Sequence, residues 1–413
     1  MTATALFNTS VMGMAAQASA LGAVSQNIAN SGTVGYKDAT TQFSTVLSSV
    51  QNGSDPAGGV TAQTGVAVTA QGNTQQTSST TDLAIQGSGF FVVSDSSGNT
   101  LLTRAGSFEP DSEGRLVNKA GYYLMGYSAD DANSPSDIAG LQTVHVAIGS
   151  LIATPSTEGS LTANLQQGAD VVDSSALPST NDASATYTSK TSVTAYDNYG
   201  NSVKLDVYFS KTADNEWEMA VYDSSKADSS SGGFPYSEGP LTTQSLSFDS
   251  NGALTSGSPT TIDVPNGQTL TLDLSGMTQL GSSFSVSDPT INGNAAQAVA
   301  SVNVDSDGTL NYVLTGGQTV PAYKIPLANV SSPSGLQSVS GNAFATNASS
   351  GTAYVGLPGT GSFGDIQSKS LESSTVDLAT QLSNMIVAQR SYTANSQVFQ
   401  VASEVMQVLN NLK

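Results

Sequence analysis

One stretch near the start of the chain decides its architecture: residues 7–28 read FNTSVMGMAAQASALGAVSQNI. Alternating steps of four and three residues trace a stripe along it, whose larger apolar members are Phe7, Val11, Met14, Leu21 and Ile28. This spacing is the a/d pattern of a helix that packs along a coiled-coil seam. It predicts a helix over residues 6–28, about 35 Å long.

The end of the chain carries a second stripe of the same kind. Its members at heptad-related positions are Leu378, Leu382, Met385, Tyr392, Phe399 and Met406. A second apolar face of the same segment consists of Val398, Val401, Val405, Val408 and Leu412. The pattern predicts a helix from Ser374 to Leu412, about 60 Å long.

Two such stripes at opposite ends favour paired helices. One stripe alone fits an ordinary amphipathic helix on a globular core equally well. Burying the large residues of the first stripe contributes on the order of 10 kcal/mol, whereas ordering the helix backbone costs about 1–2 kcal/mol for every residue. We therefore expect each helix to be ordered only when it packs on neighbours, a condition that a self-assembling subunit meets.

Between the two ends, one turn signature recurs beside strand-like runs. An Asp is followed three residues later by a Gly at 95–98, 111–114, 197–200, 249–252 and 305–308. Asp at the first position and Gly at the fourth are the preferences of a type I turn, so these sites are predicted to join hairpin strands. Residues 149–190, rich in Ser, Thr, Ala and Asp, are interpreted as a domain boundary or a mobile excursion.

The predicted fold class is therefore mainly β with α-helical termini. Two β-rich domains are expected, discontinuous in sequence and nested, because both ends read as helices and the body between them as strands. The N- and C-terminal helices are expected to form a coiled-coil-like pair. A length of 413 residues is enough for such a division, since a domain typically takes roughly 100–200 residues.

Composition excludes several classes of partner. The formal charge of -20 would repel a phosphate backbone or an anionic lipid surface, so no nucleic acid partner is expected. The chain has no Cys, which excludes disulfides and thiolate metal sites. Polar residues interrupt every apolar run, so no membrane insertion is expected. The first basic residue is Lys37, which argues against a cleaved secretory signal peptide.

No catalytic residue, cofactor or metal ligand is predicted. His145, the only histidine, is expected on the face of a strand at 144–148, and GSG at 87–89 lacks the third glycine of a dinucleotide loop. The turn at Asp305 lacks the bidentate Glu of a calcium loop. A glycosidase pair of carboxylates stays open on spacing alone, although a single Trp, Trp217, is few for a sugar cleft.

Several strings resemble the signatures of bacterial flagellar rod and hook proteins. Near the start these are SQNIAN at 25–30, TVGYK at 33–37, DLAIQGSGFF at 82–91, TRAGSF at 103–108 and GRLV at 114–117. Near the end they are LESSTVDL at 371–378 and IVAQRSY at 386–392. The residues that carry the first motif are Asn27, Ile28, Ala29, Asn30, Gly35, Tyr36 and Lys37. One departure is Thr375, where the family most often has Asn.

Within this family, size separates the hook type from the distal rod type, which lacks a large second β domain. VTAYDNYGN at 193–201 and LDVYF at 205–209 resemble the outer domain of a hook subunit, and YKIPLAN at 323–329 resembles the return to the inner domain. The resemblance implies a terminal helical axial-core domain at 1–30 and 371–413, an extended linker at 31–71 and 363–370, an inner β domain at 72–148 and 295–362, and an outer β domain at 149–294.

The resemblance implies a structural, non-enzymatic subunit of the flagellar hook, a part of the basal body that serves motility. Such subunits pass through the flagellar type III export apparatus without a cleaved signal peptide and self-assemble outside the cell. They form a curved, flexible tube that transmits torque from rod to filament and encloses the export channel.

The partners that the resemblance implies are other copies of the chain in a homopolymer, the distal rod, the hook cap, the hook-filament junction proteins and the export apparatus. The residues of the two heptad stripes would make the axial-core assembly contacts. A distal rod or other axial protein is the alternative within the family. A β-rich secreted adhesin or a glycosidase is the alternative outside it.

Overall fold

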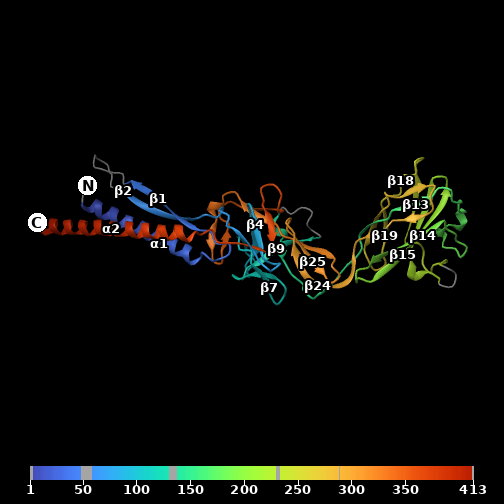
Figure 1. The fold of residues 1–413 in the computed structure, drawn as a ribbon, viewed down its shortest axis with the longest axis horizontal. Coiled ribbons are helices and arrows are strands. Elements are labelled where there is room, and N and C mark those ends of the chain that lie inside the picture. Colours follow the sequence, from blue (N-terminus) through green and yellow to red (C-terminus); the bar gives the residue numbers. More distant parts are fainter. Residues whose placement is uncertain (1–2, 48–57, 130–136, 229–232, 288, 412–413) are drawn as a thin grey trace. The chain divides into compact units, whose positions relative to one another are not determined.

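The structure is a computed structural model that describes residues 3–47, 58–129, 137–228, 233–287 and 289–411. The described residues divide into two compact units (Figure 1). Unit 1 takes in residues 1–148, 301–313 and 319–413, and unit 2 takes in 149–300 and 314–318. The predicted fold class, mainly β with a helix at each end and one β-rich part nested in the other, is confirmed.

Unit 1 contains both helices, α1 (Ala3–Ala29) and α2 (Leu378–Asn411). Its first strands are β1 (Ala39–Leu47), β2 (Gly58–Val66), β3 (Thr74–Gln76), β4 (Leu83–Gln86), β5 (Phe90–Ser94), β6 (Thr100–Thr103), β7 (Phe108–Pro110), β8 (Leu116–Asn118), β9 (Tyr123–Ser128) and β10 (Gln142–Thr143). The later ones are β25 (Thr309–Leu314), β26 (Thr319–Lys324), β27 (Leu327–Val330), β28 (Gln337–Val339), β29 (Ala343–Ala345), β30 (Ala353–Gly356), β31 (Asp365–Ser368) and β32 (Ser370–Glu372).

Unit 2 is built from strands and short turns. Its strands are β11 (Leu151–Thr154), β12 (Glu158–Ser160), β13 (Ala163–Gln166), β14 (Ser189–Tyr196), β15 (Ser202–Ala213), β16 (Glu216–Asp223), β17 (Thr242–Phe248), β18 (Leu254–Ser256), β19 (Thr260–Asp263), β20 (Thr269–Asp273), β21 (Thr278–Leu280), β22 (Ser285–Val286) and β23 (Thr290–Ile291). Strand β24 (Asn294–Val304) begins in unit 2 and ends in unit 1.

The five predicted hairpin turns are confirmed. At each, the Gly N–H donates to the carbonyl of the Asp three residues earlier, with N···O distances of 3.0–3.1 Å. The carboxylate stabilises the turn further: Oδ1 of Asp95 accepts from the backbone N–H of Ser97 at 2.8 Å and of Asn99 at 2.9 Å. The closing glycines have φ between 77° and 85°, a region that side chains disfavour.

Antiparallel pairing organises each β-rich core. In unit 1, β5 pairs with β6, β9 and β27, and its buried residues Phe90 and Val92 pack with Leu102 and Val330. In unit 2, β14 to β18 form one antiparallel sheet in sequence order, and its largest buried side chain is Trp217.

Two sequence interpretations need correction. Residues 151–166 are not a mobile excursion, because they form β11 to β13 and bury Leu161 and Leu165 in the core of unit 2. His145 does not lie in a strand over 144–148. The strand β10 ends at Thr143, and His145 makes one isolated bridge to Arg115, with its side chain exposed between buried Val144 and Val146.

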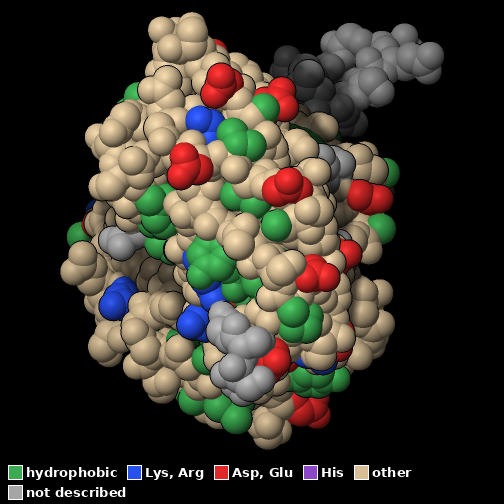
Figure 2. All heavy atoms as spheres, turned by 90° about the vertical axis from the view of Figure 1, so that its right-hand side faces the viewer, with side chains coloured by type: hydrophobic (Ala, Val, Ile, Leu, Met, Phe, Trp, Pro, Cys, Tyr) green, Lys and Arg blue, Asp and Glu red, His purple; other side chains and the backbone are tan. Residues whose placement is uncertain are grey.

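Surface composition matches the low charge of the sequence. The face drawn in Figure 2 is mostly uncharged polar side chains and backbone, with Asp and Glu scattered singly over it. Neither described helix combines the length and hydropathy that a membrane crossing requires.

A buried carboxylate in unit 2 predicts a pH dependence. Asp206 is 3% exposed and accepts hydrogen bonds from Lys190 at 2.8 Å, Ser192 at 2.7 Å and the Tyr236 hydroxyl at 2.8 Å. Burial alone would raise the pKa of Asp206, but these three donors outweigh it and lower the pKa. Because the folded pKa lies below the unfolded one, the stabilising contribution is present above the unfolded pKa, about 3.9, and is lost as pH falls through the folded pKa.

We expect Asp206→Asn to lower the stability of unit 2 at pH 7 by about 1.5–3 kcal/mol, the range for hydrogen bonds to a charged group. The variant should also lose less stability than the unmodified chain between pH 5 and the acid range. Fluorescence of Trp217 during denaturant unfolding measures this, because the only Trp lies in unit 2. Asp214→Asn, at a fully exposed side chain, is the control. Equal acid sensitivity of Asp206→Asn and the unmodified chain would contradict the prediction.

Candidate functional site

The two terminal helices lie side by side and antiparallel (Figure 1). Near the end of α1, the Asn27 side-chain amide donates to Oε1 of Gln381 at 3.2 Å. Toward its start, the rings of Phe7 and Phe399 pack with centroids 4.5 Å apart. Both residues of the aromatic pair belong to the predicted heptad stripes, so the structure brings these two predicted residues together.

The seam of the helix pair is made of small residues that sequence reasoning missed. Its buried members are Ser10, Gly13, Ala16, Ala23, Val24 and Asn27 on α1 and Gln381, Ala388 and Ala402 on α2. A Cβ at Gly13 would lie 2.8 Å from the Asn395 amide, so the helices approach each other closely there. The available signal was the heptad recurrence 381, 388, 402, one position away from the stripe of larger residues.

The other predicted stripe residues lie beside this seam. Half-buried ones are Met14, Leu21, Ile28 and Met385, together with the aromatic pair. Between 40% and 52% exposed are Val11, Leu378, Leu382, Tyr392 and Met406. The chain itself therefore leaves much of this apolar surface uncovered, and the assignment of these residues to contacts between subunits stays a prediction.

Helix α2 begins four residues later than predicted, at Leu378 instead of Ser374. The Asp377 carboxylate caps it by accepting from the Thr380 N–H at 2.7 Å, which satisfies a free helical donor. The preceding residue Thr375 is held elsewhere: its hydroxyl accepts from the Asp38 N–H at 2.9 Å and donates to the Asp38 carboxylate at 3.1 Å. The predicted end at Leu412 lies outside the described residues.

The first motif forms a hydrogen-bonded junction where α1 ends. Asn27 is fully buried, and its Oδ1 accepts from the Ala39 N–H at 2.8 Å and from the Tyr36 hydroxyl at 3.1 Å. Its Nδ2 donates to the Ala39 carbonyl at 2.8 Å as well as to Gln381. An amide supplies both donors and acceptors, which a carboxylate or hydroxyl of this size could not do.

The remaining motif residues shape the turn that follows. Asn30 accepts from the Thr33 hydroxyl at 3.2 Å and donates to the Gln26 carbonyl at 2.8 Å. Gly35 has φ of 67°, and a Cβ there would lie 2.7 Å from the Ala105 nitrogen. Ile28 is half-buried and Ala29 exposed, and no side-chain hydrogen bond is possible for either.

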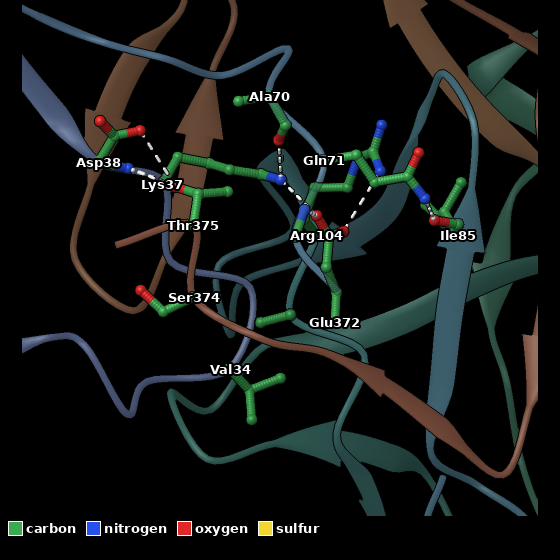
Figure 3. A network of polar contacts seen from close by, with 12 residues as sticks. Val34, Lys37, Asp38, Ala70, Gln71, Ile85, Arg104, Glu372, Ser374 and Thr375 are labelled. Carbon is green, nitrogen blue, oxygen red and sulfur yellow. Dashed lines mark hydrogen bonds and ion pairs between the residues drawn. The ribbon is translucent and has the colours of Figure 1, made fainter. Parts of the chain in front are cut away.

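Next to this junction lies a buried cluster of three charges (Figure 3). The Lys37 ammonium contacts Oε1 of Glu372 at 2.5 Å, and the Arg104 guanidinium contacts Oε2 at 3.3 Å. The Gly72 N–H donates to Oε1 at 2.8 Å, and Arg104 also donates to the Gly87 carbonyl at 2.8 Å. All three charged side chains are at most 4% exposed.

Electrostatics explains why these groups occur together. Burial lowers the pKa of Lys37, and the hydrogen bond and charge of Glu372 oppose that shift. Burial likewise lowers the pKa of Arg104, and Glu372 again opposes it. Because both oxygens of Glu372 are engaged, the carboxylate holds segments together instead of presenting a reactive atom. Among the described residues, no cluster of His, Asp and Glu is arranged to hold a metal ion.

The cluster joins three strings that the sequence had kept apart: Lys37 comes from TVGYK, Arg104 from TRAGSF and Glu372 from LESSTVDL. It anchors the exit of α1, the approach to α2 and the first β sheet of unit 1 at one point. The region expected as an extended linker contains the hairpin of β1 and β2, which pair over nine positions from Ala39↔Val66 to Leu47↔Gly58.

Comparison with known proteins follows this organisation. Four family models match: Flagella basal body rod protein over residues 7–37, Flagellar hook protein FlgE/F/G D1 domain over 84–151, Flagellar basal body protein FlaE D2 domain over 164–294, and Flagellar basal body rod FlgEFG protein C-terminal over 367–412. The Flagellar hook protein FlgE of Brucella suis is 44% identical, with 99% of this chain and 98% of the relative covered. The chain belongs to the flagellar hook protein family.

Members from other bacteria agree. The FlgE of Rhizobium meliloti is 42% identical, with 98% of both chains covered. That of Salmonella typhimurium is 33% identical, with 98% of this chain and all of the relative covered. The crystal structure of Helicobacter pylori flagellar hook protein FlgE2 aligns with a TM-score of 0.48 and 15% identity, covering 72% of this chain and all of that one.

Family membership confirms the resemblance seen in the strings and assigns the chain a structural role as a subunit of the flagellar hook. Its location is the hook, and its assembly is with the flagellar hook and rod proteins. The hook protein family is structural and is not known for enzymes.

Proposed function

We propose that this chain is a non-enzymatic subunit that polymerises, outside the cell, into a curved and flexible hook tube enclosing the export channel. The observation that carries this is the helix pair, which exposes apolar residues along its length. Leu382, Ile386 and Val387 are each at least half exposed. Helix α1 contains no charged residue, and α2 contains only Arg390 and Glu404. Such a surface is poorly suited to water and well suited to neighbours.

In this proposal the predicted stripe residues make the axial-core contacts, and the cluster around Glu372 transmits force between the helices and the β body. Torque applied to one end of the tube must cross this junction, and a buried, multiply bonded cluster resists displacement of its segments. The partners are other copies, the distal rod, the hook cap, the hook-filament junction proteins and the flagellar type III export apparatus, which exports the chain without a cleaved signal peptide.

The domain division proposed from the sequence assigns 1–30 and 371–413 to the axial core, 31–71 and 363–370 to the linker, 72–148 and 295–362 to the inner β domain, and 149–294 to the outer β domain. The two compact units support an outer boundary near residue 148, with a return near residue 300. We propose that the outer domain sets tube curvature, since residues near the axis suffice for polymerisation.

Negative-stain microscopy of concentrated protein tests the proposal, and tubes of uniform diameter are the expected result. Discrete particles at all concentrations would contradict it. Replacing residues 149–300 by a short Gly/Ser bridge should leave tubes that form at higher protein concentration and have altered curvature. An unchanged native curvature would show that the outer domain does not set the shape of the tube.

A further inference from the structure

The helix pair carries a groove on one flank. It lies between α1, α2 and β1, and its volume is about 270 Å³. Ala20, Ala23, Ala39 and Ala388 line it with small side chains, and Phe43 and Val387 also border it. Both of these larger residues are strongly exposed, Phe43 at 49% and Val387 at 63%. The structure therefore leaves an apolar groove with two uncovered aliphatic or aromatic borders.

The size and lining of the groove indicate what could occupy it. Its volume is below the range of roughly 300–1,000 Å³ that is typical of small-molecule sites. None of its lining residues is charged. An occupant should therefore be a row of uncharged, apolar side chains.

The same helix offers such a row on its other flank. Leu378, Leu382 and Tyr392 are 48%, 52% and 41% exposed. At about 100° per residue, Leu382 and Tyr392 each lie about 140° around the helix from Val387, and Leu378 lies about 180° from it. We call these three residues the leucine edge. The leucine edge and the groove thus point in nearly opposite directions.

Both surfaces also occupy the same level of the helix pair, because the leucine edge spans residues 378–392 and the α2 part of the groove spans 381–388. Two surfaces on opposite flanks of one rigid helix cannot meet within one chain. They can meet between copies that stand side by side, and an interface between two different patches repeats from copy to copy instead of stopping at a dimer.

We propose that the groove of one copy receives the leucine edge of the α2 helix of a neighbouring, parallel copy. This inference rests on the proposed polymer and specifies which surfaces meet in it. Leu382 enters beside Val387, and Phe43 of the β1–β2 hairpin covers the inserted side chains from the other border. The result is a row of parallel helix pairs, which is the arrangement that the wall of a tube requires.

Disulfide cross-linking tests this contact directly, because the chain has no Cys and introduced thiols are the only ones present. Chains carrying Val387→Cys are mixed with chains carrying Leu382→Cys, allowed to polymerise, and oxidised mildly. A disulfide requires Cβ atoms about 3.5–4.5 Å apart. We expect a strong cross-linked dimer band in the polymer and none in dilute monomer. Leu382→Cys and Val387→Cys in one chain should give a ladder of higher multimers.

Ser383→Cys mixed with Val387→Cys is the matched control, because Ser383 is exposed on the same helix but lies on the groove side. Tubes with equal bands for the Leu382 and Ser383 mixtures would overturn the inference and leave the proposed function intact. So would a double variant that stops at dimers, or a stronger band between Val387→Cys and Val405→Cys, which would place the valine face in the groove. Failure of the unmodified chain to form tubes would overturn both proposals.

Discussion

Glu372→Gln is expected to destabilise unit 1 by about 3–5 kcal/mol, the range for removing one partner of a buried ion pair. The substitution keeps the size of the side chain and one acceptor oxygen. It leaves the charges of Lys37 and Arg104 buried without an anion, and these charges are at most 4% exposed. Such uncompensated charge is the reason for the large effect.

Two probes separate this effect from general unfolding. Far-ultraviolet circular dichroism during denaturant unfolding follows both units, whereas fluorescence of Trp217 follows unit 2. We expect the dichroism transition to move to lower denaturant while the fluorescence transition stays in place. Lys37→Met in the Glu372→Gln background should recover part of the loss, because it removes one of the stranded charges.

Glu113→Gln is the control for this prediction. Glu113 forms an exposed ion pair with Arg115 at 2.9 Å, with its own side chain 65% exposed. Exposed pairs of this kind contribute about 0–1 kcal/mol, so the control should barely move either transition. A Glu372→Gln chain as stable as the Glu113→Gln chain would show that the charge cluster is not what anchors the junction.

Phe399→Asp is expected to abolish tube formation. Phe399 packs against Phe7 between the two helices, and a carboxylate there would be forced against an aromatic ring. Burying an unpaired charge costs several kcal/mol, and each 1.4 kcal/mol is a factor of ten in an association constant. The concentration needed for polymerisation should therefore rise by about a hundredfold or more, measured by sedimentation and negative-stain microscopy.

Gln400→Asp places the same charge one residue further along, at an exposed position, and should polymerise nearly as the unmodified chain does. In both variants the Trp217 unfolding transition should be unchanged, because the substitution lies in unit 1. Tubes of Phe399→Asp at the concentration that suffices for the unmodified chain would remove these residues from the axial-core contacts.

The sequence by itself determined the features that depend on near neighbours. The five Asp-to-Gly turns form because each Asp binds the backbone only two to four residues ahead. Both terminal helices follow from apolar periodicity, and the strings around Asn27 and Leu378 were enough to indicate the family. The predicted start of the second helix was wrong because Thr375 bonds to Asp38, a partner distant in the chain.

Only the tertiary structure decided which stripe of each helix forms the seam and what lies at their root. A heptad of large residues and a heptad of small ones stand one position apart, and the small one was chosen because Gly13 lets the backbones approach. Likewise, no spacing rule links Lys37, Arg104 and Glu372. They meet because a buried carboxylate must find cations wherever the fold brings them, and the strand pairing of β3 with β32 delivers Glu372 to that point.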